Sequence, residues 1–237
     1  MTAVAPIIEV RDVSVRFGGV QALNRASLSV LPGRVTGVIG PNGSGKSTLF
    51  NVATGVVRPN RGSVRFRGEE IANLPPHRIN RLGIGRTFQL TRLFGQLTAL
   101  ENLVVVARED GAAARRRAEE LLGGVGLLPL RDEYAANLSY GQGKLLEFAR
   151  LMMTDPALVM LDEPFAGVNP TMERRLLDQI AGWIGAGKTV VVTDHEMAIM
   201  MEVCQELWVL DHGEVIARGT PDQVRDDERV MEAYFGR

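Results

Sequence analysis

Residues 40–48 read Gly-Pro-Asn-Gly-Ser-Gly-Lys-Ser-Thr, and this stretch decides the fold. It has the spacing G-x-x-x-x-G-K-[ST], with an apolar run before it (35–39) and a helix-like run after it (47–54). A strand, a glycine-rich loop and a helix in this order predict a phosphate-binding loop. Glycine lets bare backbone N–H groups face phosphate oxygens, and the helix directs its positive end at the same anion.

The side chains of this loop have distinct predicted roles. Lys46 is expected to reach the β- and γ-phosphates of a nucleotide, and the Ser47 hydroxyl to bind Mg²⁺. The plain alternative is a glycine-rich turn before a helix. Because the chain has only three lysines, a chance match is expected on the order of once in a hundred. The predicted nucleotide contacts are Gly40, Pro41, Asn42, Gly43, Ser44, Gly45, Lys46, Ser47 and Thr48.

Composition limits the classes to which the chain can belong. Its 237 residues are enough for one large domain or two small ones, and 45% hydrophobic residues allow a sizeable core. The net charge of −1 argues against a general nucleic-acid binder. Cys204 is the only cysteine, so no internal disulfide can form and a reducing compartment is indicated.

Residues 1–6 have neither the basic start nor the long apolar core of a signal peptide. No apolar run approaches the ~18 residues that would span a bilayer. We therefore expect a soluble protein, and any role at a membrane would have to pass through a partner.

Several segments have the pattern of β-strands. Apolar and polar residues alternate through residues 7–39, which predicts short antiparallel strands. Buried strands are also predicted at 84–89, at 157–161, where the apolar run is continuous, and at 189–193. Phe17, followed by two glycines, looks exposed; it is either a stacking surface for an adenine ring or an ordinary core residue.

Polar side chains follow the three predicted buried strands. Gln89 ends the first, Asp162 and Glu163 follow the second, and His195 follows the third. In open parallel sheets, ligands bind at the carboxyl ends of the strands. Asp162 is therefore expected to serve Mg²⁺ and Glu163 to polarise an attacking water. A lone histidine is more often structural, but its place at a strand end favours a functional role for His195.

Helical patterns cover much of the remaining chain. One extends from residue 98 to about 123, and Arg115–Arg117 within it is expected to be a solvated face. Another extends from Ser139 to about Met153, where Ser139 predicts either an anion site or an ordinary N-cap. The last is a helix after His195, whose Met197, Met200, Met201 and Cys204 are expected to pack in the core rather than form a metal or redox site.

Together the motifs resemble the ATP-binding subunit of ABC transporters over nearly the whole chain. Any one of these motifs would be weak evidence, whereas five in the right order are specific. Residues 40–47 match the Walker A loop, Gln89 the Q-loop, 138–142 the signature motif, 159–163 Walker B with its glutamate, 167–170 the D-loop, and His195 the switch histidine.

This resemblance implies an α/β P-loop NTPase of ABC type. Residues 1–237 would form one ABC ATPase domain, with a parallel core sheet, an N-terminal antiparallel β region and a helical subdomain at about 90–155. Two such cassettes would hold two ATP molecules between them, and their separation after hydrolysis would move membrane subunits. The implied site residues besides the phosphate loop are Phe17 on the base; Ser139, Gly141 and Gln142 from the signature; Gln89 and Asp162 at Mg²⁺; and the catalytic residues Glu163, His195 and Gln89.

Within the family, residues 75–94 and 219–234 look like the ATPase subunits of branched-chain amino acid importers. The implied partners are a second ATPase subunit, identical or related, transmembrane permease subunits and, indirectly, a solute-binding protein. The chain would then be cytoplasmic and peripheral on the inner face of the membrane. Tyr140 stands where the wider family has Gly, although this importer group often has Tyr, and Gly143-Lys144 replaces the more usual Gln-Arg.

Two rival functions and one open alternative remain at this point. Non-transport ABC ATPases of DNA repair or translation usually carry two cassettes or a long coiled-coil insertion, and neither is seen in this sequence. A GTPase would need an Asn-Lys-x-Asp motif, and no Asn-Lys pair occurs. In the stretch 90–96, the apolar pair Leu93 and Phe94 is either a core anchor or a docking surface; the resemblance, which places a membrane-subunit helix here, favours docking.

Overall fold

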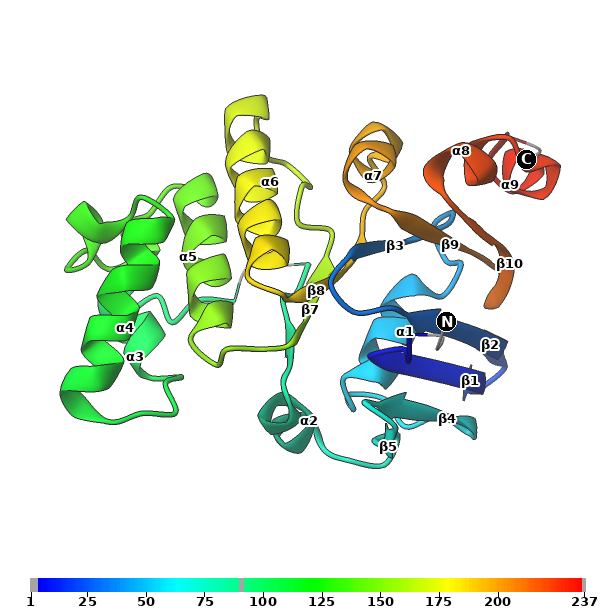
Figure 1. Cartoon of the computed structure of the whole chain (residues 1–237), viewed down its shortest axis with the longest axis horizontal. Coiled ribbons are helices and arrows are strands. Elements are labelled where there is room, and N and C mark those ends of the chain that lie inside the picture. Colours follow the sequence, from blue (N-terminus) through cyan, green and yellow to red (C-terminus); the bar gives the residue numbers. More distant parts are fainter. Residues whose placement is uncertain (1–3, 90–91, 236–237) are drawn as a thin grey trace.

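The computed structural model describes residues 4–89 and 92–235, which contain two β-sheets with helices around them (Figure 1). The larger sheet has six strands in the order β10-β9-β3-β8-β7-β6, and the smaller has the order β2-β1-β4-β5. The six are β3 (Val35–Ile39), β6 (Ile84–Arg86), β7 (Leu158–Asp162), β8 (Thr189–Thr193), β9 (Glu206–Asp211) and β10 (Glu214–Gly219).

The larger sheet confirms the predicted parallel core. β3 pairs in parallel with β8 and β9, and β7 pairs in parallel with β6 and β8. β10 returns as an antiparallel edge strand beside β9. All residues of β3, β7 and β8 are buried, as expected when helices or a second sheet cover both faces.

The smaller sheet is the antiparallel N-terminal region. It comprises β1 (Ile8–Phe17), β2 (Val20–Val30), β4 (Arg61–Phe66) and β5 (Glu69–Glu70). β1 and β2 have 10 and 11 residues, so the prediction of short strands was wrong. Both strands continue through register shifts, where Asp12 and Arg25 adopt positive φ angles of 49° and 48°, and these bulges let one long strand replace two short ones.

Helix α1 (Lys46–Ala53) lies between the two sheets (Figure 1). Its Phe50 is fully buried in a cluster that also contains Val10 of β1 and Met160 of β7. The opposite face of the parallel sheet, which includes Val190, packs against a second cluster with the helices. The period of two in each strand divides its side chains between these two clusters.

The remaining helices are α2 (Pro76–Leu82), α3 (Ala99–Val104), α4 (Gly111–Gly124), α5 (Tyr140–Met152), α6 (Pro170–Gly185), α7 (Met197–Val203), α8 (Pro221–Arg225) and α9 (Glu228–Phe235). Figure 1 shows α3, α4 and α5 side by side at one end of the molecule, next to α6. They share the second cluster with the sheet, and the rings of Phe148 (α5) and Trp183 (α6) have their centroids 5.0 Å apart. None of the helices in the described ranges is long and apolar enough to cross a membrane.

Two predictions about these elements need correction, and one helix was missed. The stretch 98–123 is two helices, because residues 108–110 are polar and Gly111 takes a φ of +62°. The strand predicted to reach Gln89 ends at Arg86, although the Thr87 amide still donates to the carbonyl of Met160. Helix α6 was not predicted, although Asn169 caps it and Pro170 occupies its first turn.

Two predictions about side chains are confirmed. Arg115 and Arg116 are exposed and Arg117 is partly exposed, and Arg115 and Arg117 pair with Glu119 and Glu120 on the same helix. The methionine helix packs in the core, where Met200 and Cys204 are buried. Burial raises the pKa of the Cys204 thiol to about 12, so this side chain keeps its proton.

Candidate active site

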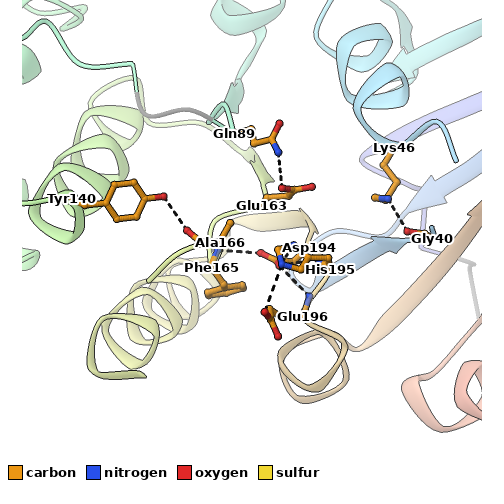
Figure 2. Close-up of polar contacts among 10 residues, drawn as sticks. All are labelled: Gly40, Lys46, Gln89, Tyr140, Glu163, Phe165, Ala166, Asp194, His195 and Glu196. Carbon is orange, nitrogen blue, oxygen red and sulfur yellow. Dashed lines mark hydrogen bonds and ion pairs between the residues drawn. The ribbon is translucent and has the colours of Figure 1, made fainter. Parts of the chain in front are cut away.

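The predicted site residues follow four neighbouring strands of the parallel sheet. The phosphate loop follows β3, His195 follows β8, Asp162 ends β7, and Gln89 comes three residues after β6. These strands are parallel, so their carboxyl ends lie along one edge of the sheet. Figure 2 shows Gln89, Glu163 and His195 near one another at this edge.

The phosphate loop requires its glycines for steric reasons. Gly40 and Gly45 have φ angles of 151° and 108°. A Cβ atom on Gly40 would lie 2.1 Å from the carbonyl oxygen of Leu210, and one on Gly45 would lie 2.6 Å from that of Ala22. The loop is therefore held tightly against β2 and β9, and only glycine fits at these two positions.

The polar groups of the loop fit an anion. Lys46 Nζ folds over the loop and donates to the carbonyl oxygens of Gly40 (2.7 Å) and Pro41 (3.0 Å). Gly45 precedes α1 and provides no side-chain cap, and among the described residues the buried Ser44 hydroxyl has no hydrogen-bond partner. Uncapped N–H groups, an orphan hydroxyl and a lysine at one helix start fit the phosphates of a nucleotide.

Lys46 also interacts electrostatically with the two carboxylates at the end of β7, those of Asp162 and Glu163. Burial lowers the pKa of its ammonium group, and the negative charges of Glu163 and Asp162 act in the opposite direction. The three side chains therefore belong to one electrostatic site.

Asp162 is paired with an arginine that the sequence analysis did not single out. Arg86 Nη2 lies 2.7 Å from Asp162 Oδ2, and both side chains are only 7% exposed. The other arm of Arg86 donates from Nη1 to Asn51 Oδ1 (2.7 Å) on α1 and to Thr54 Oγ1 (3.1 Å) at the C-terminal cap of that helix. The available signal was a charged residue within a segment predicted to be a buried strand, since buried charges need partners.

Glu163 is held at a defined place beside Gln89. Its backbone has a φ of 48°, and its N–H donates to the carbonyl of Thr193 at 2.8 Å. The side-chain amide of Gln89 donates to Glu163 Oε2 at 2.8 Å (Figure 2). A left-handed conformation at a non-glycine residue is sparsely populated and persists only where the surrounding structure enforces it.

His195 lies in a loop organised by Asp194, a second residue that sequence reasoning missed. The buried Asp194 carboxylate accepts hydrogen bonds from the backbone N–H groups of Phe165 (3.1 Å), His195 (2.8 Å) and Glu196 (3.1 Å). Asp194 therefore ties the loop after Glu163 to the loop that carries His195. Its position directly after a buried strand, like that of Asp162, was the available signal.

The signature residues form the start of α5. Ser139 Oγ accepts from the N–H of Gln142 (3.3 Å), and Gln142 Oε1 accepts from the N–H of Ser139 (2.8 Å). This reciprocal capping box shows that Ser139 is the N-cap of α5 and that the side chain of Gln142 takes part in the cap, while the role of Ser139 at an anion stays a prediction. A Cβ atom on Gly141 would lie 2.6 Å from Met172 Cε, so glycine permits the close approach of α6.

Tyr140 and Lys144 show what the two departures from the family pattern do. The Tyr140 hydroxyl donates to the carbonyl of Ala166 at 2.9 Å, which links α5 to the loop after Glu163. The Lys144 side chain is buried, with its Nζ 5.7 Å from the centre of the Tyr140 ring. In Figure 2, Tyr140 and Lys46 lie on opposite sides of Glu163, so one chain does not bring its signature helix to its own phosphate loop.

The remaining predicted site residues are Phe17, expected at the base of the nucleotide, and Ser47 and Asp162, expected at Mg²⁺. Phe17 is half exposed at the end of β1, so the core interpretation of this residue was wrong. Among the described residues, no three His, Cys, Asp or Glu side chains are gathered into a metal site. Mg²⁺ is usually held by one or two carboxylates together with substrate phosphates. The Ser47 hydroxyl and the Asp162 carboxylate fit this pattern as the protein's oxygen ligands.

Comparisons with known proteins show the family of the chain. Residues 23–166 match the profile described as ABC transporter, and 214–237 match the one described as branched-chain amino acid ATP-binding cassette transporter. The chain is 40% identical to the high-affinity branched-chain amino acid transport ATP-binding protein BraF of Pseudomonas aeruginosa, with 98% of both chains covered. It is 36% identical to the corresponding protein LivG of Escherichia coli, again over 98% of both.

Solved structures give the same result. A nucleotide-free ATP-binding cassette from an ABC transporter superposes with a TM-score of 0.89 at 33% identity, covering 98% of this chain and 100% of the other. A dimeric cassette bound to ADP and phosphate after hydrolysis superposes with a TM-score of 0.81 at 25% identity, covering 90% of this chain and 98% of the other. The chain belongs to the ABC transporter family. It is an ATP hydrolase, and its activity powers transport.

Proposed function

We propose that this ATPase drives an importer of branched-chain amino acids or related small polar solutes. The observation that carries the proposal is similarity over 98% of the chain to a branched-chain amino acid transport ATPase, together with the separate match of residues 214–237. The solute would be chosen by a binding protein and permease subunits, which the ATPase would contact only at the membrane. The chain would then be cytoplasmic and peripheral on the inner face of the membrane.

The working unit is a pair of cassettes, formed by two copies or by one copy and a related chain. Each ATP lies between Lys46 of one cassette and Ser139 and Gly141 of the other. The separation of Tyr140 from Lys46 within one chain supports this arrangement, because each phosphate loop then needs a second chain to complete its site. In this proposal, residues 1–237 form one ABC ATPase domain with a helical subdomain at about 90–155.

Most of the chemistry is positioning and charge neutralisation. The phosphate loop and Lys46 bind the phosphates, and Phe17 stacks on the base. Ser47, Asp162 and Gln89 would hold Mg²⁺, which when bound neutralises charge on the β- and γ-phosphates. Glu163, held by Gln89, accepts hydrogen-bond donation from the attacking water and polarises it, while His195 contacts the γ-phosphate.

The solute can be tested in vesicles that contain the cassette, its permease subunits and the binding protein. We expect ATP turnover to rise when the binding protein carries leucine, isoleucine or valine, and to stay basal with urea or a small amide. Stimulation by urea or an amide alone would contradict the amino-acid assignment while retaining the importer. Stimulation of the cassette by ribosomes or DNA, with no response to any loaded binding protein, would favour the non-transport alternative.

A groove beside the Gln89 loop is the proposed docking site for a permease helix. It encloses about 580 Å³ and is lined by Asn80, Arg86, Phe88, Arg92, Leu93, Phe94, Val106, Glu147, Arg150, Leu151 and Thr154. The apolar pair of this stretch divides: Leu93 packs against the core cluster, whereas Phe94 is half exposed. Arg150 stacks 5.5 Å from the Phe94 ring centre and donates to the carbonyl of Arg92. Leu90 and Thr91 lie outside the described residues.

Phe94→Ala is expected to leave the basal ATPase activity of the isolated cassette nearly intact and to reduce its stimulation by the permease subunits. The reason is that the exposed ring contributes little to the core and much to a partner surface. ATP turnover with and without reconstituted permeases measures this. Tyr134→Ala, at a similarly exposed aromatic residue outside the groove, is the control. A loss of several kcal/mol in stability, with stimulation preserved, would make Phe94 a core anchor instead.

A further inference from the structure

Arg86 joins three elements around the active site. Its Nη2 contacts the Asp162 carboxylate at the end of β7, and its Nη1 contacts Asn51 of α1 and Thr54, which caps the C-terminal end of α1. The guanidinium carbon lies 5.6 Å from the ring centre of Phe50 and 5.1 Å from that of Phe88. These contacts, together with burial, fix the plane and direction of the guanidinium group.

The two arms of Arg86 have different targets, and this is what fixes Asp162. One arm contacts Oδ2 of the carboxylate at 2.7 Å, which holds this oxygen toward β6. The other arm is anchored on the helix that begins at Lys46, so the carboxylate is held in register with the phosphate loop. A lysine could supply the charge but not this planar two-armed contact.

Stability alone is a weak reason for this buried pair. Both side chains are removed from water, and replacing a buried ion pair by apolar residues is often neutral or stabilising. Carboxylates that bind metals are commonly oriented by a hydrogen-bonded neighbour, whose loss weakens the metal site. Asp162 is a carboxylate of this kind if its proposed role at Mg²⁺ holds.

We propose that Arg86 is a positioning residue for the metal site: it orients the Asp162 carboxylate and couples that orientation to helix α1. The inference rests on the proposed role of Asp162. Arg86 also lines the groove beside Phe88, so the same side chain touches both the docking surface and the metal-binding carboxylate.

The test measures Mn²⁺ binding by electron paramagnetic resonance, in the full chain loaded with a non-hydrolysable ATP analogue. Arg86→Lys is expected to weaken Mn²⁺ binding by about 10–100-fold, the usual effect of losing such a neighbour. Binding of the ATP analogue without metal should stay unchanged, because Lys46 and the loop are untouched. A residue that acted only on the fold would lower both affinities together.

Two further variants keep the result interpretable. Asn51→Ala removes an acceptor of the anchoring arm and leaves Asp162 its partner, so it should weaken Mn²⁺ binding relative to the wild type, but less than Arg86→Lys. If Arg86→Lys does not fold, wild-type Mn²⁺ binding in Asn51→Ala overturns the inference. Arg218→Lys is the matched control, because Arg218 also pairs with a carboxylate (Glu206, 2.8 Å) and stacks on an aromatic ring (Trp208, 4.5 Å), but on the β9–β10 hairpin. It should leave Mn²⁺ binding unchanged.

Unchanged or tighter Mn²⁺ binding in Arg86→Lys would overturn the inference, and tighter binding would mean that the arginine competes with the metal. Asp162→Asn separates this failure from that of the proposed function. If Asp162→Asn weakens Mn²⁺ binding and Arg86→Lys does not, only the role of Arg86 is wrong. If Asp162→Asn has no effect, the metal assignment of Asp162 is itself wrong.

Discussion

Glu163→Gln is expected to retain ATP binding and to lower turnover by roughly 10²–10⁴-fold, the usual contribution of a general base. Glutamine keeps the size of the side chain and can still contact the side-chain amide of Gln89. Its neutral amide cannot accept a proton from the attacking water. In the proposed cycle hydrolysis separates the two cassettes, so the variant should accumulate as an ATP-bound dimer. Steady-state ATPase assays and size-exclusion chromatography with ATP and Mg²⁺ measure the two effects.

The control for this prediction is Glu120→Gln, on the exposed side of α4, which should hydrolyse ATP normally and dimerise no more than the wild type. Normal hydrolysis by Glu163→Gln would show that Glu163 is not the residue that polarises water. A monomer at every concentration would contradict the dimer, provided that a related ATPase chain from the same transporter has also been added and fails to pair.

Lys46→Ala is expected to abolish tight ATP binding. Lys46 is the only cation within the 40–48 loop, and its ammonium group is held over the loop by the carbonyl oxygens of Gly40 and Pro41. Without it, the negative charge of the phosphates would face Asp162 and Glu163 with less compensation. Equilibrium titration with a fluorescent ATP analogue measures the affinity.

Lys188→Ala provides the matched comparison, since Lys188 pairs with Asp155 at 2.6 Å and follows the C-terminal end of α6. Its affinity for the analogue should equal that of the wild type. An affinity that survives in Lys46→Ala as well would remove the phosphate-loop assignment on which the other roles depend.

The sequence predicted best what depends on neighbouring residues. Strands β3 and β8 occur at the expected residues, and β7 begins and ends one residue later than expected, because a continuous apolar run between turn residues needs no distant information. The phosphate loop was predictable for the same reason. Residues at the strand ends could be assigned to one site because parallel strands end at one edge.

What the sequence did not predict depends on distant pairs or on a missed local signal. The contact of Arg86 with Asp162 spans 76 residues, and that of Asp194 with the amide of Phe165 spans 29. Neither pair has a spacing that marks it. Helix α6 was predictable from Leu176, Ile180 and Trp183, which are buried on one face at helical spacing, but its cap and its period were overlooked.

The buried state of Cys204 makes this chain a convenient host for spectroscopic labels. Because its only thiol is shielded and keeps its proton, a thiol-reactive dye or spin label would leave the folded protein unmodified. A cysteine introduced at an exposed position such as Glu120 would therefore be labelled alone, with no native cysteine to remove first. In a pair of identical cassettes, the two labels would report the distance between them, and so follow the opening and closing of the dimer during turnover.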